Sequence, residues 1–223
     1  MDPDQWQTYL VTQQTLSEGR STVEIVEKAI DGGIDAVQLR EKEMSAKDRY
    51  ELGQTLRELT AEAGVALIVN DRVDLACAID ADGVHLGQSD LPISVAREQL
   101  GDEATIGVSV STVSEARLAA ITGADYLGVG AIYGTTSKPQ APTAEDGLGL
   151  EALSDIVQTV RIPVTAIGGI SPENAAEPIE AGASSVAVIS AITAADDPAA
   201  AADDLRNAVG RSASEAETEA GDD

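Results

Sequence analysis

Short apolar runs alternate with amphipathic segments along almost the whole chain. The apolar runs are rich in Val, Ile and Leu, as is typical of strands that are buried on both faces. There are eight of them, at residues 8–11, 36–40, 66–70, 83–86, 105–110, 126–130, 164–167 and 185–189. Helix start signals precede the amphipathic segments: Ser21 stands three residues before Glu24, and Ser45 precedes a helix expected to end at Ala63.

A degenerate repeat marks the predicted helix-to-strand junctions. It reads Gly33-Ile34-Asp35, Gly123-Ala124-Asp125 and Gly182-Ala183-Ser184, with a looser copy at Asp80-Ala81-Asp82. A glycine at such a junction can end a helix in the left-handed conformation at little cost. Eight strand–helix units between about residues 8 and 209 predict an α/β fold, a (β/α)8 TIM barrel that forms a single domain over residues 1–210. An open doubly wound sheet is the alternative, but no Gly-x-Gly-x-x-Gly follows the first strand.

The end of the chain has a different composition. Residues 211–223 are rich in Ala, Glu and Asp and carry almost no large apolar side chain. Such a segment cannot bury enough apolar surface to offset the loss of chain entropy. We therefore expect an acidic, disordered tail.

The charge of the chain excludes some partners. Its 223 residues include 39 Asp and Glu but only 14 Lys and Arg, for a net charge of -25. A surface this acidic repels phosphate backbones and anionic bilayers, so we expect neither a nucleic acid nor a membrane partner. Two hypotheses explain the excess. The protein is adapted to a very salty cytoplasm, where charge repulsion is screened, or an acidic surface docks a basic partner.

Other features point to a cytoplasmic location. No apolar run approaches the roughly 20 residues that a membrane helix needs. The first residues, from Met1 to Asp4, lack the basic region of a secretion signal. The single cysteine, Cys77, forms no intrachain disulfide and is expected to be a small core residue.

Basic side chains follow two of the predicted strands. The alternation of side chains along a strand puts Gln38, Arg40 and, if the extended run continues, Lys42 on one side. Lys138 lies in a long polar loop after the sixth strand. Active sites of such barrels lie at the carboxyl ends of the strands, and cations that converge there need an anion, which favours a diphosphate. A structural ion pair of Arg40 with Glu41 or another carboxylate is the alternative.

Two carboxylates end neighbouring predicted strands. Asp71 and Asp90 are close enough in this arrangement to share a cation. Hard oxygen ligands without clustered Cys or His favour Mg²⁺, which also bridges to substrate phosphates. We expect one Mg²⁺ per subunit, held by these two residues beside the diphosphate. A role as helix caps is the alternative, because Asp is favoured at such positions.

A second anion site is expected after the last two strands. The seventh predicted strand ends in Gly168-Gly169 and the eighth in Ile189-Ser190. Glycines let backbone N–H groups approach a ligand closely, and these two loops are the usual phosphate site of such barrels. Tight packing alone is the other explanation for the glycines. Two phosphorylated groups that face each other imply a group transfer in which diphosphate leaves.

Seven polar motifs occur in a distinctive order. They are Gln38-Leu39-Arg40-Glu41-Lys42, Asn70-Asp71, His85-Leu86-Gly87-Gln88-Ser89-Asp90, Gly107-Val108-Ser109, Thr135-Thr136-Ser137-Lys138, Ala166-Ile167-Gly168-Gly169-Ile170 and Val188-Ile189-Ser190-Ala191-Ile192. As an ordered set they resemble the thiamine-phosphate synthase (thiamine monophosphate pyrophosphorylase) family, over about residues 8 to 209. The resemblance implies that 4-amino-2-methyl-5-hydroxymethylpyrimidine diphosphate is joined to 4-methyl-5-(2-hydroxyethyl)thiazole phosphate. The products would be thiamine phosphate and diphosphate, formed when the thiazole nitrogen captures a pyrimidine carbocation.

The resemblance also assigns roles by position. It implies that Gln38, Asn70 and Ser109 contact the pyrimidine or its diphosphate. Arg40, Lys42 and Lys138 would bind the diphosphate, and Asp71 and Asp90 would hold Mg²⁺. Thr135, Ser137, Gly169 and the Ile189-Ser190 backbone would hold the thiazole phosphate. Catalysis is assigned to Arg40, Lys42, Ser109 and Lys138, because neutralising charge on the leaving group lowers the barrier to ionisation.

Some positions depart from the family, and alternatives remain open. The family usually has Phe-Pro-Thr where this chain reads Tyr133-Gly134-Thr135, and Thr where it has Ser137. A related thiazole tautomerase has a histidine where this chain has Ser111, and it needs no diphosphate pocket. An isomerase of that kind and a non-catalytic thiazole-phosphate-binding barrel are the alternative functions. His85 is expected to be packed or to orient another residue, and Trp6 to plug the barrel. A homo-oligomer is possible.

Overall fold

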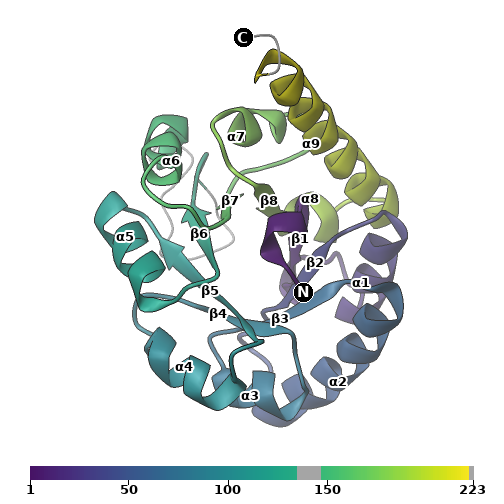
Figure 1. Ribbon diagram of the computed structural model, residues 1–223. Helices are drawn as coiled ribbons and strands as arrows, with labels where there is room; N and C mark the ends of the chain where they lie inside the picture. The colour runs from purple at the N-terminus through teal and green to yellow at the C-terminus, as the bar shows by residue number, and fades with distance from the viewer. Residues whose placement is uncertain (135–146, 221–223) are drawn as a thin grey trace.

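The eight predicted strands close into one barrel. The computed structural model describes residues 1–134 and 147–220, and of residues 211–220 only the backbone. The strands are parallel and pair in chain order from β1 to β8, with β8 closing on β1 (Figure 1). They are β1 (Thr8–Val11), β2 (Ala36–Leu39), β3 (Ala66–Asn70), β4 (Gly83–Leu86), β5 (Thr105–Val110), β6 (Tyr126–Gly130), β7 (Val164–Ile167) and β8 (Ser185–Val188). The (β/α)8 barrel is thereby confirmed, and the open sheet is excluded.

Helices surround the barrel. They are α1 (Thr22–Asp31), α2 (Ala46–Ala63), α3 (Val73–Ala78), α4 (Ile93–Leu100), α5 (Val113–Thr122), α6 (Gly149–Val157), α7 (Ala176–Glu180), α8 (Ser190–Thr193) and α9 (Pro198–Ala220), with short 3-10 turns η1 (Pro3–Gln5) and η2 (Gln14–Leu16). The predicted starts hold in part. Ser45 caps α2 and Ser21 caps α1 through its hydroxyl, whereas a complete capping box occurs at α5, between Thr112 and Glu115.

The core has two layers, as an aliphatic barrel requires. Outward-facing strand residues and the inner faces of the helices form the larger one, which holds Leu10, Leu67, Leu127 and Leu153 at 0% exposure. The smaller layer fills the barrel lumen and contains Trp6. The centroid of the indole lies 5.5 Å from the ring centroid of Tyr9, with the rings tilted, and 5.3 Å from that of Tyr126, in an edge-to-face contact. Trp6 therefore plugs the barrel as expected.

The sequence repeat corresponds to a repeated hydrogen bond at the amino-terminal ends of the strands. The third residue of each copy accepts a bond from the backbone N–H of the preceding strand, at 2.9 Å for Asp35, 2.8 Å for Asp82, 2.7 Å for Asp125 and 3.4 Å for Ser184. The donors are Thr8, Leu67, Ile106 and Val164. The four copies precede β2, β4, β6 and β8, so the barrel repeats itself in pairs of strands.

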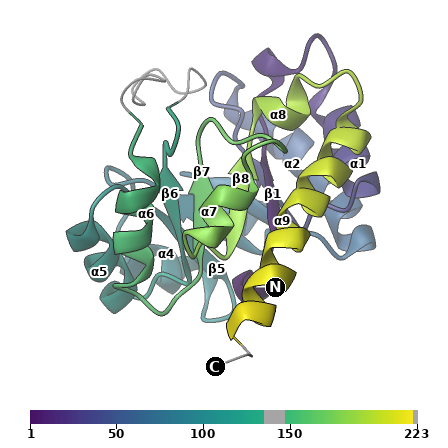
Figure 2. The same cartoon turned by 90° about the horizontal axis from the view of Figure 1, so that it is seen from above.

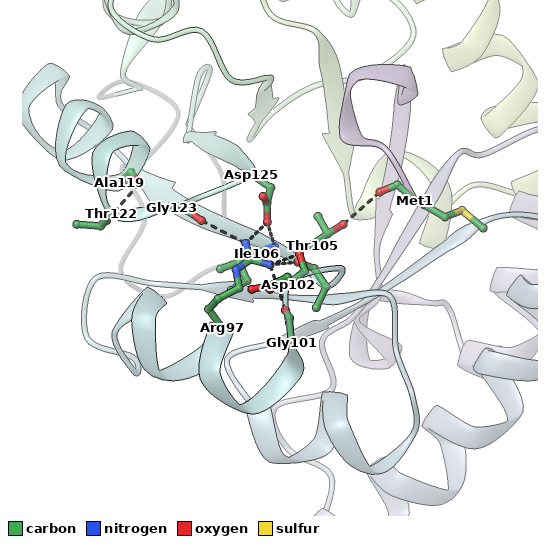
Figure 3. A network of polar contacts seen from close by, with 11 residues as sticks. Met1, Arg97, Gly101, Asp102, Thr105, Ile106, Ala119, Thr122, Gly123 and Asp125 are labelled. Atoms are coloured by element: carbon green, nitrogen blue, oxygen red, sulfur yellow. Dashed lines mark hydrogen bonds and ion pairs between the residues drawn. The ribbon is translucent and has the colours of Figure 1, made fainter.

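Arginines complete three of the four copies. They are Arg206 with Asp35 at 2.9 Å, Arg57 with Asp82 at 2.6 Å and Arg97 with Asp125 at 2.6 Å. Figure 3 shows the third copy, in which Arg97 also donates to the carbonyls of Gly101 and Gly123. We call this arrangement the strand clamp. Each clamp ties a helix to the start of two neighbouring strands.

The structure corrects the expectation for Cys77 and extends a helix across an expected boundary near the end of the chain. Cys77 is exposed and not a core residue, because α3 turns Val73, Leu75 and Ala76 toward the core and leaves position 77 on the solvent side. At the end of the chain, α9 continues to Ala220. The expected boundary between residues 210 and 211 therefore lies within a helix, and the disorder of residues 211–223 stays a prediction.

Candidate active site

The predicted site residues that the structure describes gather at the carboxyl ends of the strands. In Figure 2, helix α8, which follows β8, lies at the opposite end of the barrel from the N-terminus and from the last turns of α9. Thr135, Ser137 and Lys138 lie outside the described residues. The described residues before and after that gap lie close together, and Tyr133 is bonded to the residue after β7. Tyr133 donates its backbone N–H to Gly168, and a Cβ on Gly147 would lie 2.8 Å from the Gly134 nitrogen.

Arg40 borders an anion-sized cleft. The cleft of about 500 Å³ is lined by the η2 segment on one side and by the turn after β2 on the other, and it includes Arg40 and Lys42. Arg40 is 7% exposed. Its Nη1 donates to Oε1 of Gln13 at 2.9 Å, whereas its buried Nε has no hydrogen-bond partner among the described residues. Such an orphaned donor on a buried cation fits an anionic ligand.

The backbone around Lys42 differs in detail from the expectation. Strand β2 ends at Leu39, so the extended run does not continue to Lys42, which lies in a turn. Its Nζ nevertheless reaches Oδ2 of Asp71 at 3.0 Å. Glu41 also lines the cleft, but its carboxylate is held by other groups: it accepts from the backbone N–H of Gln14 and from the hydroxyl of Thr22. The glutamate thus anchors the η2 wall and is not an ion-pair partner of Arg40.

Asp71 and Asp90 come together, as the sequence predicted. Asp71 follows β3 with a left-handed φ of 63°, and Asp90 accepts from the backbone N–H of Gly87 at 2.6 Å. The two carboxyl groups lie close enough for each to affect the pKa of the other. Burial and the neighbouring Asp71 raise the pKa of Asp90. Burial acts in the same direction on Asp71, but Lys42 outweighs it and the pKa of Asp71 is lowered.

This carboxylate pair suits a divalent cation. Within the described part of the chain, no group of three or more His, Cys, Asp or Glu residues could hold a metal ion. Mg²⁺ needs fewer protein ligands, because it keeps several waters and binds through one or two carboxylates and substrate phosphates. Two neighbouring carboxyl groups beside the cations Lys42 and Arg40 therefore fit Mg²⁺ next to a diphosphate.

Three further predicted contacts lie at or near the ends of β2, β3 and β5. Asn70 is the last residue of β3, directly before Asp71, and its side chain helps to lower the pKa of that carboxyl group. Gln38 is buried and donates its Nε2 to the hydroxyl of Tyr9 at 2.9 Å. Ser109 near the end of β5 contacts Nε2 of His85 at 2.8 Å. One small cavity is lined by Gln38, Ser109 and Arg40. This cavity joins the lumen to the cleft, because Arg40 lines both.

The expected phosphate loop has the required backbone. Gly168 and Gly169 have left-handed φ values of 105° and 70°. A Cβ on Gly169 would lie 2.7 Å from the carbonyl oxygen of Gly134, so the loop also packs too tightly for a side chain. Ile189 caps α8, and the first N–H groups of that helix, from Ser190 on, have no intrahelical acceptor. Both proposed uses of the glycines, packing and phosphate binding, are compatible with this geometry.

Sequence reasoning missed three residues of this site. Gln13 holds Arg40, and the hydroxyl groups of Tyr9 and Tyr126 lie 3.0 Å apart in the lumen. The only sequence signal was the position of both tyrosines within buried strands, where a phenol needs a partner. Their partners come from other strands, which the sequence order does not identify.

Known proteins share this sequence over most of its length. Residues 8–192 match the family model of thiamine monophosphate synthase. The thiamine-phosphate synthase of Haloarcula marismortui is 59% identical over 204 residues, which cover 92% of this chain and 97% of that protein. The one from Moorella thermoacetica is 53% identical over 207 residues, which cover 93% of this chain and 97% of that protein.

A solved structure shows the same fold with a related sequence. The thiamine phosphate pyrophosphorylase from Pyrococcus furiosus superposes with a TM-score of 0.85 at 42% identity. The match covers 94% of this chain and 98% of that one. Fold and sequence thus lead to the same group of proteins.

Proposed function

The chain belongs to the thiamine monophosphate synthase family, and we propose that it works by neutralising charge on a leaving diphosphate. It is an enzyme, a transferase that makes thiamine phosphate. Its substrates in this proposal are 4-amino-2-methyl-5-hydroxymethylpyrimidine diphosphate and 4-methyl-5-(2-hydroxyethyl)thiazole phosphate. The C–O bond to diphosphate breaks first, and the thiazole nitrogen then donates its electron pair to the carbocation.

The observation that carries the proposal is the state of Arg40. A guanidinium stays charged at neutral pH, and here it is buried with an orphaned Nε beside a cleft that Lys42 shares. Burial lowers the pKa of Arg40, and the charges of Asp71 and Glu41 act against that shift. A diphosphate in the cleft would pair with both cations, and Lys138 would add a third.

Asp71 and Asp90 would hold one Mg²⁺, which supplies charge neutralisation on the diphosphate oxygens when it is bound. Asn70, Gln38 and Ser109 would orient the pyrimidine or its diphosphate. Thr135, Ser137, Gly169 and the backbone of Ile189 and Ser190 would hold the thiazole phosphate. No nucleophile or general base is needed, because positioning and electrostatic stabilisation do the work.

The cellular setting is part of the proposal. In the part of the chain that the structure describes, no helix is both long and apolar enough to cross a membrane. We place the enzyme in the cytoplasm, with small-molecule substrates and without nucleic acid or membrane partners.

The test is a reaction with both substrates. The enzyme with Mg²⁺ should release diphosphate and form thiamine phosphate, and omitting either substrate or chelating Mg²⁺ should stop product formation. An isomerase would convert a thiazole without using the pyrimidine, and a binding protein would take up thiazole phosphate without releasing diphosphate. The proposal is wrong if no diphosphate is released at any KCl concentration.

A further inference from the structure

A chain of polar groups crosses the barrel lumen from β2 to β5. It runs from Nε2 of Gln38 to the hydroxyl of Tyr9 at 2.9 Å, and on to the hydroxyl of Tyr126 at 3.0 Å. From there it reaches Nδ1 of His85 at 2.9 Å, and Nε2 of His85 contacts Oγ of Ser109 at 2.8 Å. We call it the lumen chain. Its two ends, Gln38 and Ser109, are both predicted substrate contacts.

The surrounding strands are shaped to hold these rings. Tyr9 is 1% exposed and Tyr126 0%. A Cβ on Gly107 would lie 2.1 Å from the Tyr126 ring, and a Cβ on Gly128 would lie 2.9 Å from Cε1 of His85. Side chains at these two strand positions would displace the rings. The glycines therefore make the space in which the lumen chain lies.

Every hydroxyl proton of the lumen chain finds an acceptor only if all hydrogen bonds run in one direction, from Gln38 toward Ser109. Burial raises the pKa of both Tyr9 and Tyr126, so both phenols keep their proton. The Gln38 amide donates to Tyr9. Among the described residues, the only other group bonded to the Tyr9 hydroxyl is that of Tyr126, so the Tyr9 proton is donated there.

The direction then passes along the chain. The Tyr126 hydroxyl, which accepts from Tyr9, donates its own proton to Nδ1 of His85. A neutral imidazole that accepts at Nδ1 carries its proton on Nε2. His85 therefore donates to Oγ of Ser109. The Ser109 proton is left to point away from the histidine.

We infer that His85, Tyr126 and Tyr9 are positioning residues, which hold Ser109 as a hydrogen-bond donor toward an acceptor atom of the bound pyrimidine diphosphate. This inference rests on the proposed function, because that function supplies the acceptor. With the opposite tautomer, Ser109 would donate to His85 and offer the substrate only lone pairs. A donor aimed at a site where negative charge develops stabilises the transition state.

The tautomer can be measured without any substrate. The chain contains one histidine, so a tag-free protein labelled with ¹⁵N-histidine gives the signals of His85 alone. We expect a neutral ring with Nε2 protonated and Nδ1 unprotonated. In Tyr126→Phe, which keeps the ring but removes the donor, the Nδ1-protonated form should appear. An imidazolium, or an Nδ1-protonated ring in the unsubstituted enzyme, would overturn the inference.

Turnover provides the second readout. Ser109→Ala should lower kcat on the order of 10²-fold, the usual effect of losing one such donor. Tyr126→Phe should lower kcat about tenfold and Tyr9→Phe about twofold, because these residues lie two and three hydrogen bonds further from the substrate than Ser109. In the Ser109→Ala background, Tyr126→Phe should have almost no additional effect. Tyr50→Phe, on the exposed side of α2, is the matched control and should keep full activity.

The outcomes separate the inference from the proposed function. An equal loss from Tyr126→Phe in both backgrounds would mean that Tyr126 only supports packing, and the inference fails although the enzyme is active. Absence of turnover in the unsubstituted enzyme removes the proposed function and this inference with it. If Tyr126→Phe lowers the melting temperature so far that it is unfolded in the assay, His85→Gln takes its place in the same double-variant comparison.

Discussion

Asp71 and Asp90 repel each other in the folded chain. The charge of Asp71 raises the pKa of Asp90, and Lys42 reaches Asp71 at 3.0 Å. Neighbouring like charges oppose folding unless one is protonated or a cation lies between them. A pair that lowers stability but lies beside the proposed diphosphate cleft is better explained by ligand binding than by helix capping.

The variant Asp90→Asn tests this explanation. We expect turnover to fall on the order of 10²-fold, because a metal ion on a phosphoryl oxygen contributes several kcal/mol to the transition state. The concentration of Mg²⁺ for half-maximal diphosphate release should rise. The melting temperature should stay the same or increase, since the repulsion from Asp71 is relieved.

Asp74→Asn is the control for Asp90→Asn. Asp74 lies on α3 in a surface ion pair with Arg72 and is 63% exposed, so its loss should change neither turnover nor the Mg²⁺ requirement. Full activity of Asp90→Asn at low Mg²⁺ would contradict the assigned role of the carboxylate pair.

At single positions, the sequence showed which residues carry chemistry but not which residues hold them. The alternation of a strand placed Gln38 and Arg40 on one side, and both line the same cavity. Gln13 was not predicted, because its bond to Arg40 joins the turn after β1 to the end of β2. Such contacts depend on the closure of the barrel, which no local pattern encodes.

Among the elements, α5 has the most complete amino-terminal cap. The hydroxyl of Thr112 accepts from the backbone N–H of Glu115, and the Glu115 carboxylate accepts from the backbone N–H groups of Ser111 and Thr112. The N–H of Ser111, opposed in part by burial, holds the pKa of Glu115 below its usual range. The carboxylate therefore stabilises the folded state only while it is ionised.

Acid should weaken this cap. A group with a lowered pKa in the folded state contributes stability above the ordinary glutamate pKa of about 4.3, and the contribution is lost as the pH falls through the folded-state value. Urea unfolding of Glu115→Gln should therefore show a smaller loss of stability below about pH 4 than the unsubstituted chain. Thr112→Ala should cost about 1 kcal/mol at neutral pH. If the stability of Glu115→Gln and that of the unsubstituted chain changed with pH in the same way, the role of the Glu115 carboxylate in the cap would be contradicted.

The strand clamps make a second prediction about elements. Asp125 satisfies the backbone N–H of Ile106 and pairs with Arg97 (Figure 3). Asp125→Ala leaves that N–H without its acceptor, so the free energy of unfolding should fall by about 1–3 kcal/mol. Asp125→Ser copies Ser184, the residue at the same place in the fourth copy of the repeat, which accepts the backbone N–H without an arginine, and it should cost less.

Turnover provides the control for the clamp variants. The clamps lie at the amino-terminal ends of the strands, whereas the site residues lie at the carboxyl ends, as in barrels generally. Both Asp125 variants should keep their kcat at a temperature where they are folded. Equal stability of Asp125→Ala and the unsubstituted chain in urea would show that the clamp contributes nothing.

Element boundaries were predicted closely because each strand is a short apolar run between polar signals. Only β2 and β8 end one residue earlier than expected, at Leu39 and Val188. The repeat also marked the right junctions. Even the copy without a leading glycine keeps the left-handed turn, since Asp80 has a φ of 53°. What the repeat did not show was the arginine, because it comes from a helix elsewhere in the chain.

For the whole molecule, the charge remains to be explained. Even if every Lys and Arg formed an ion pair, 25 acidic residues would have no basic partner. The Debye length is about 10 Å at 0.1 M salt and about 3 Å at 1 M, so repulsion across the surface decreases steeply over this range. Adaptation to a salty cytoplasm predicts a protein that needs this screening, whereas docking to a basic partner does not.

The melting temperature and the turnover should therefore both rise when KCl is increased from about 0.1 M to about 2 M. Glu58→Lys together with Glu62→Lys makes the net charge four units less negative at two exposed positions. Both lie in the last turns of α2, which lead into the start of β3, whereas the site residues lie at the carboxyl ends of the strands. This variant should melt at a higher temperature than the parent at low salt, and its melting temperature should depend less on KCl. Full stability and activity of the parent at 0.1 M KCl would instead favour the basic partner, because the acidic surface would then have no need of salt.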